Sequence, residues 1–179
     1  MLRIITGSKK GKRIEVPESA RPITDRIRTS IFDTIAPVIK GAAVLDLYSG
    51  SGAFGLEALS RDAYLAHFVE NNRVAVETIT QNVKNLGFES QSEIKRQDVE
   101  EYISSSTNIF DIIMFDPPFK VSATDKFKLL TKTSKLLAKQ GVLIFRYPET
   151  EKYATIIPGI VLLHSKKFGL SIVNYYQKV

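Results

Sequence analysis

Cysteine is absent from this chain of 179 residues. Its absence excludes disulfide frameworks, thiolate zinc sites and cysteine nucleophiles. No apolar run approaches the roughly 20 residues that a membrane-spanning helix needs, and residues 1–12 lack the apolar core of a signal peptide. We therefore expect an intracellular, cytoplasmic protein with no membrane partner and no bound metal.

Positive charge is unevenly distributed along the chain. Residues 1–40 hold nine lysines and arginines against four acids, whereas residues 41–179 hold 16 against 15. Five of the six net positive charges therefore lie in the first 40 residues. A solvated basic tail has this composition, and so does a segment that binds a polyanion. We expect two units: a basic extension over residues 1–40 that binds RNA, and a near-neutral body over residues 41–179.

The apolar pattern predicts a hairpin, a helix, and then alternating strands and helices. Residues 2–6 and 12–16 are expected to form the hairpin, and Thr24 to cap a helix that ends near Ala36, before Pro37. Strands are expected at residues 43–48, 65–70, 92–96, 109–115, 141–147, 160–168 and 170–177, and helices at residues 52–62, 72–86, 99–104 and 123–139. This alternation is typical of a Rossmann-like α/β fold with helices on both faces of the sheet. The near-direct connection between the last two strands requires one antiparallel strand, so we expect a mixed seven-stranded sheet.

Four acidic residues follow four of the expected strands, at the edge where such sheets bind ligands. They are Asp46, Glu70, Asp98 and Asp116. Residues 50–55 match G-x-G-x-x-G, and Glu70 comes 20 residues after Gly50, which alone indicates a dinucleotide site. Four carboxylates would repel a pyrophosphate but attract the sulfonium and ammonium groups of S-adenosylmethionine. The pattern therefore favours S-adenosylmethionine, with helix capping as the alternative role for each acid.

The expected cofactor site combines the glycine loop with residues that follow the second and third strands. Glu70 is expected to accept hydrogen bonds from the ribose hydroxyls, and Asp98 from the adenine amino group. Glycines at positions 50 and 52 allow the backbone to approach the cofactor. The complete expected set is Asp46, Tyr48, Gly50, Ser51, Gly52, Glu70, Asn71, Asp98 and Val99.

The segment Asp116-Pro117-Pro118-Phe119 carries the expected chemistry, which is methyl transfer to a planar amino nitrogen. The Asp116 carboxylate and the Pro117 carbonyl can accept the two amino hydrogens and orient the nitrogen lone pair. The two prolines restrict the backbone, and Phe119 can stack on a base that has left its own stack. An ordinary turn after a strand is the alternative interpretation.

Seven basic residues are expected to contact RNA. They are Lys9, Lys10, Lys12 and Arg13 on the hairpin, and Arg21, Arg26 and Arg28 around the following helix. The apolar face of that helix is expected to exclude Arg26 and Arg28. Capping or ion pairing within the fold remains an alternative for these two residues.

Several of these segments resemble the RsmD-type 16S rRNA guanine-N2 methyltransferases. The similarity runs through Arg3-Ile4-Ile5-x-Gly7, Arg21-Pro22-x-Thr24-Asp25-Arg26-x-Arg28, residues 50–61 and residues 116–119, and it covers essentially the whole chain. The resemblance implies a Rossmann-like methyltransferase fold and S-adenosylmethionine as cofactor. It also implies a guanine N2 of 16S rRNA as target, in the small ribosomal subunit or its assembly intermediate.

Three other functions are compatible with parts of the pattern. A DNA adenine-N6 or cytosine-N4 methyltransferase would use the same chemistry, but the chain leaves little room for a domain that recognises a DNA sequence. A nicotinamide-dependent oxidoreductase is disfavoured by the acidic edge. A non-catalytic RNA-binding assembly factor would not need Asp116. We expect a monomeric enzyme.

Overall fold

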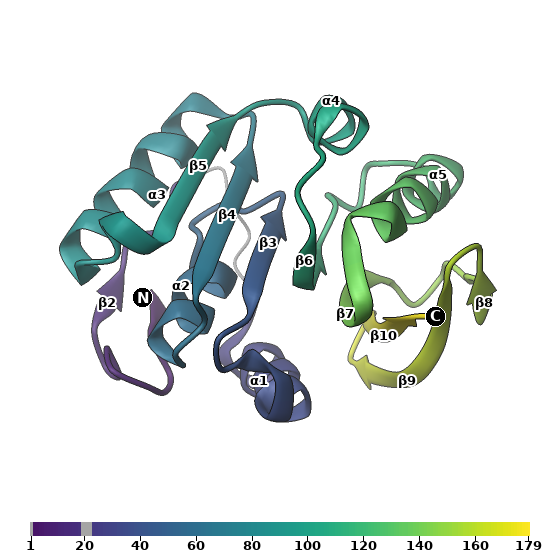
Figure 1. Cartoon of the computed structure of the whole chain (residues 1–179), viewed down its shortest axis with the longest axis horizontal. Coiled ribbons are helices and arrows are strands. Elements are labelled where there is room, and N and C mark those ends of the chain that lie inside the picture. Colours follow the sequence, from purple (N-terminus) through teal and green to yellow (C-terminus); the bar gives the residue numbers. More distant parts are fainter. Residues whose placement is uncertain (1, 19–22) are drawn as a thin grey trace.

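The computed structural model describes residues 2–18 and 23–179, which are built around one large mixed sheet (Figure 1). Its strands are β3 (Ala43–Leu47), β4 (Leu65–Glu70), β5 (Ser92–Arg96), β6 (Phe110–Phe115), β7 (Leu137–Pro148), β8 (Ile156–Ile157), β9 (Ile160–Phe168) and β10 (Ser171–Lys178). Their order across the sheet is β5, β4, β3, β6, β7, β10, β9, β8. Strands β3 to β7 are parallel, and β10 is antiparallel to both of its neighbours. The expected mixed Rossmann-like fold is confirmed.

The expected number of seven strands is wrong by one, because β8 adds an eighth strand at the edge of the sheet. Strand β8 is two residues long and pairs with β9 through Ile157 and Ile160. Pro158 and Gly159 form the turn between them, and Ile157 is buried. Two apolar residues are too short a run to be recognised as a strand from sequence.

Helices cover both faces of the sheet. Helices α1 (Asp25–Ile39), α2 (Ala53–Ser60) and α3 (Arg73–Leu86) pack in one hydrophobic cluster, and α4 (Val99–Ser105) and α5 (Ala123–Thr133) pack in the other. Two 3-10 turns are η1 (Glu89–Gln91) and η2 (Ser134–Leu136). Successive residues of a strand point to opposite faces of the sheet, so Val44 packs in the first of these clusters and Leu45 in the second. Within the described ranges, no helix has the length and apolar character to cross a membrane.

Two helix ends differ from expectation. Helix α1 continues through Pro37 to Ile39, since Pro37 gives up only the hydrogen bond to the carbonyl of the exposed residue Asp33. The helix expected over 123–139 ends at Thr133, because β7 begins at Leu137, which pairs with Phe110 of β6. The local apolar pattern is compatible with a helix there, and the tertiary pairing decides against it.

The N-terminal hairpin, β1 (Leu2–Arg3) and β2 (Arg13–Ile14), is shorter than expected because α2 takes over some of its backbone bonds. The backbone N–H groups of Ile5 and Thr6 donate to the Glu57 carboxylate, at 2.7 and 3.0 Å. A Cβ on Gly7 would lie 1.7 Å from the carbonyl oxygen of Ser60, so only glycine allows this approach. The hairpin also shares a hydrophobic cluster with the body. The division at residue 40 stays a prediction.

Candidate active site

The glycine loop connects β3 to α2 and is braced by the carboxylate at the end of β4. Glu70 Oε2 accepts a hydrogen bond from the N–H of Gly50 at 3.0 Å. Gly52 has a φ of 75° and precedes α2, and the hydroxyl of Ser49 donates to the carbonyl of Asp46 at 2.6 Å. A Cβ on Gly55 would lie 2.4 Å from the ring of Phe68, so α2 rests directly on β4. The loop is therefore held against the carboxyl edge of the sheet.

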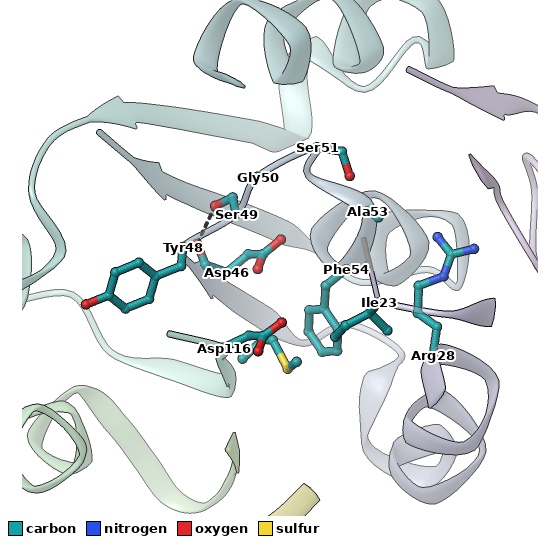
Figure 2. Close-up of a pocket in the computed structure, with 11 residues that line it drawn as sticks. Ile23, Arg28, Asp46, Tyr48, Ser49, Gly50, Ser51, Ala53, Phe54 and Asp116 are labelled. Carbon is teal, nitrogen blue, oxygen red and sulfur yellow. Dashed lines mark hydrogen bonds between the residues drawn. The ribbon is translucent and has the colours of Figure 1, made fainter. Parts of the chain in front are cut away.

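This edge contains a cavity of about 80 Å³ between the ends of β3 and β6 and the start of α1 (Figure 2). The cavity is lined by Ile23, Arg28, Asp46, Tyr48, Ser49, Gly50, Ser51, Ala53, Phe54, Met114 and Asp116. Four expected cofactor residues and the expected catalytic carboxylate thus lie around one space. Arg28, expected to contact RNA, lies on its wall.

Asp46 is a buried carboxylate on the cavity wall, 3% exposed. Its Oδ2 accepts a hydrogen bond from the N–H of Gly55 at 3.1 Å. Burial raises the pKa of Asp46 well above its usual value, and the carboxylates of Asp116 and Glu70 raise it further. A cation in the cavity would favour the charged form of Asp46.

Asp116 follows β6 and faces two cations. Its Oδ1 accepts a hydrogen bond from Arg146 Nε at 2.8 Å. Burial raises the pKa of Asp116, while the charges of Arg146 and Lys126 act to lower it. Phe119, the last residue of the segment 116–119, is 46% exposed. The Arg146 guanidinium lies 5.1 Å from the centroid of the Phe119 ring. The loop after β6 therefore presents a carboxylate and an accessible aromatic ring together. Pro117 is buried and Pro118 is exposed.

Arg146 and Lys126 contribute to this site, and the sequence assigned neither of them a role. Lys126 is 0% exposed, its Nζ lies 2.7 Å from Glu151 Oε1, and it is 5.9 Å from the Phe119 ring centroid. The sequence places Arg146 at the carboxyl edge, but its partner follows from the register in which Phe115 pairs with Phe145. A buried lysine on a helix carries no sequence signal, because lysine is almost always exposed.

The remaining expected cofactor residues lie along the same edge but outside the cavity. Asp98 is exposed, and its Oδ1 accepts hydrogen bonds from the N–H groups of Glu100 and Glu101, so it caps α4. Val99 is buried and Asn71 is exposed. Their contacts with a cofactor stay predictions.

Tyr48 connects the cavity to that acidic edge. Its φ of 59° is unusual for a residue other than glycine, and its ring centroid is 6.0 Å from that of Phe115. Burial, with the carboxylates of Asp98, Glu100 and Glu70, raises the pKa of Tyr48 to about 12. Tyr48 therefore lies within the electrostatic influence of all three acids.

The expected RNA-contact residues are divided between surface and interior. Lys10, Lys12, Arg13 and Arg26 are exposed, and Lys9 is half-buried with its Nζ 5.5 Å from the Phe88 ring centroid. Arg21 lies outside the described residues. Arg28 is 1% exposed, so the expectation that it stands clear of the buried face of α1 is wrong. Among the described residues, no group of three or more histidines and acids could hold a metal ion.

Comparison with known proteins relates the whole chain to one family. Residues 2–177 match the family model described as Conserved hypothetical protein 95. The chain is 33% identical over 180 residues to the ribosomal RNA small subunit methyltransferase D of Escherichia coli, covering 99% of this chain and 90% of that protein. The Haemophilus influenzae protein of the same name is 32% identical over 184 residues, with coverages of 98% and 93%. A solved structure of an E. coli protein assigned as a methyltransferase, yhhF, has a TM-score of 0.88 and 30% identity, covering 99% and 97%.

Proposed function

Because this chain belongs to the family described as Conserved hypothetical protein 95, the RsmD family, we propose that it methylates the N2 amino group of a guanine in 16S rRNA, using S-adenosylmethionine. The relatives' names support the coarser part of this proposal, methylation of small-subunit ribosomal RNA. The choice of guanine N2 rests on the family resemblance. The 16S rRNA would be bound within the small subunit or its assembly intermediate.

One observation carries the proposal: Asp116 and the glycine loop line the same cavity. The cavity polarity fits S-adenosylmethionine, because Asp46 and Asp116 face a space in which a sulfonium and an ammonium would be attracted. The same two carboxylates would repel a pyrophosphate, which disfavours a nicotinamide dinucleotide. Asp46, Tyr48, Gly50 and Ser51 would hold the cofactor.

Asp116 and its neighbours are suited to orient an amino group. Bound S-adenosylmethionine would supply an electrophilic methyl group to the amino nitrogen, and the Asp116 carboxylate could take the proton that the methylated nitrogen releases. Asp116 uses Oδ1 for Arg146, and its Oδ2 has no hydrogen bond from the described residues, so Oδ2 can accept an amino hydrogen. Pro117 can accept the second hydrogen through its carbonyl. Phe119 offers an exposed ring on which the guanine can stack.

The exposed basic residues of the hairpin and α1 are proposed to hold the RNA backbone. Lys10, Lys12, Arg13 and Arg26 are available to phosphates, which position a protein without reading sequence. The hairpin is anchored to α2, whose first turn lines the cavity, so RNA held there would have a fixed position relative to the active site. Arg21 and Lys9 belong to the same proposal.

The proposed enzyme would act as a cytoplasmic monomer. Bacterial ribosomal subunits are assembled in the cytoplasm, which is where this substrate is found. Light scattering during gel filtration tests the monomer, and fractionation of cells tests the location.

The deciding experiment uses purified protein, labelled S-adenosylmethionine and small subunits from a strain that lacks the gene. Digestion to nucleosides and mass spectrometry should identify N2-methylguanosine in 16S rRNA, with the Asp116→Ala protein as control. Double-stranded DNA and deproteinised 16S rRNA form parallel reactions. N6-methyladenine or N4-methylcytosine in the DNA would support the DNA methyltransferase instead. RNA binding without any methylated product would support the assembly factor.

A further inference from the structure

Arg28 is a buried cation, and only one nitrogen of its guanidinium makes hydrogen bonds to the described residues. Its Nη2 donates to the carbonyl of Arg3, and also to Asp25 Oδ1 at 2.8 Å. Its Nε and Nη1 are buried and have no hydrogen-bond partner among the described residues. Burial lowers the pKa of Arg28, and the charges of Glu57 and Asp25 only partly oppose this. Leaving a charged donor buried and unpaired is costly, which indicates that an anionic ligand completes the site.

The unpaired atoms leave Arg28 with donors for an anion. The N–H groups of Nε and Nη1 point to different sides of the guanidinium, so a carboxylate can accept a hydrogen bond from one of them without a two-pronged contact. Because Nη2 already donates to Arg3 and Asp25, Nε and Nη1 are the donors that remain.

The cavity that Arg28 lines carries opposite charges on its two sides. Figure 2 shows Asp46 and Asp116 on one side and Arg28 on the other. Ala53 and Phe54, in the first turn of α2, also line it, and the N-terminal end of a helix favours an anion. A volume of 80 Å³ holds roughly six water-sized groups at about 10–15 Å³ each. Such a space fits the zwitterionic end of an amino acid.

We infer that Arg28 binds the α-carboxylate of the methionine part of S-adenosylmethionine, while Asp46 faces its ammonium group. This inference rests on the proposed cofactor and replaces the contact with RNA expected for Arg28. A buried guanidinium is out of reach of a phosphodiester backbone, whereas the end of a small ligand can enter the cavity. The carboxylate is the one anionic group of this cofactor, so Arg28 would select for it.

The test compares two ligands that differ only in this carboxylate. These are S-adenosylhomocysteine and its decarboxylated analogue, S-adenosyl-3-thiopropylamine, and calorimetry without RNA measures both affinities. We expect the wild-type protein to prefer S-adenosylhomocysteine by about 10- to 150-fold, the range for hydrogen bonds to charged groups. Arg28→Met should abolish this preference, and Arg28→Lys should keep part of it.

Control variants separate this role from a structural one. Asp25→Asn removes the ion-pair partner of Arg28 outside the cavity, and Arg26→Met removes an exposed positive charge from the same helix. Both should retain the wild-type preference. If Arg28→Met weakens both ligands equally, Arg28 is only structural and the inference is overturned.

The wild-type measurement is decisive even if Arg28→Met does not fold. Equal affinity of the wild-type protein for the two ligands overturns the role of Arg28 but leaves the proposed function intact. Binding of neither ligand to the wild-type protein overturns the proposed cofactor as well.

Discussion

The two carboxylates of the cavity differ in what the protein provides for them. Asp116 has Arg146 at 2.8 Å and the positive charge of Lys126 nearby. Asp46 accepts a hydrogen bond from a backbone N–H, and the charges that perturb it are those of Asp116 and Glu70. Burial raises the pKa of both, but the surrounding charges lower the pKa of Asp116 and raise that of Asp46 further.

This difference assigns a different ligand to each carboxylate. Arg146 and Lys126 favour the charged form of Asp116 against the effect of burial, and that form can accept a hydrogen from a neutral amino group of the base. Asp46 gains its counter-charge when a cation enters the cavity, which suits the ammonium of a cofactor. The comparison predicts that substitutions at the two positions affect different steps.

The largest effect is expected from Asp116→Ala. This change removes the acceptor for the target amino group, and the methylation rate should fall by about 10²- to 10³-fold, as when one preorganised hydrogen-bond partner is lost. Single-turnover kinetics on small subunits measures the rate. The affinity for S-adenosylhomocysteine should remain close to that of the wild type. Methylation at a rate near that of the wild type would contradict the role of Asp116.

The next largest effect is expected from replacing Arg146, which should change how kcat depends on pH. Asp116 must be ionised to act, and Arg146 lowers its pKa against the effect of burial. In Arg146→Gln that pKa rises, so the acid limb of the kcat profile should move to higher pH, with activity lost first at low pH. Arg146→Lys retains a positive charge and should restore much of the wild-type profile.

Lys126 on α5 and Asp46 on β3 also face Asp116 and are unchanged in both Arg146 variants. They act equally in all three proteins, so the comparison isolates Arg146. If the kcat profile of Arg146→Gln keeps the acid limb of the wild type, Arg146 does not control the ionisation of Asp116.

A smaller effect is expected from Phe119→Leu. Loss of base stacking costs about 1–3 kcal/mol by substitution of an aromatic residue, and the leucine retains some apolar surface. The KM for small subunits should rise, while the affinity for S-adenosylhomocysteine stays unchanged. Phe127→Leu is a matched control, since Phe127 is another exposed aromatic residue of this part of the chain. An equal rise in KM in both variants would argue against stacking on Phe119.

The smallest effect per residue is expected on the hairpin. Replacing Lys10, Lys12 and Arg13 by glutamine should weaken small-subunit binding and flatten its dependence on salt. The slope of the logarithm of the binding constant against the logarithm of salt concentration should change by roughly 0.7–0.9 for each lost phosphate contact. Filter binding across a salt series measures this. An unchanged slope would identify the hairpin as a solvated extension.

Sequence was sufficient to predict the elements that determine the site. The alternation of strands and helices predicted the order of the main sheet elements, because apolar periodicity is a local property. It also placed Asp46, Gly50 and Asp116 at one edge, since the ends of parallel strands share an edge. The cavity confirms that these residues lie together.

Features that depend on long-range contacts could not be predicted. The apolar periodicity of α1 placed Arg28 off the buried face, but Arg28 is buried because it packs against the hairpin and donates to the carbonyl of Arg3. Glu57 looks like an exposed helical residue, yet it is buried and binds the backbone of Ile5 and Thr6. Lys126 is buried for the same kind of reason, because Glu151 is 25 residues away in the chain.

The most direct test of the central claim, that Asp46 serves the cofactor and Asp116 the base, is proton release on cofactor binding. Since the pKa of Asp46 is raised in the free protein, an ammonium beside it should lower that pKa and release a proton at pH values between the pKa of the free protein and that of the complex. Calorimetry of S-adenosylhomocysteine binding in buffers of different ionisation enthalpy measures this release. The account predicts release in the wild type and in Asp116→Asn, and its loss in Asp46→Asn. Undiminished release in Asp46→Asn, or its loss in Asp116→Asn alone, would contradict the account.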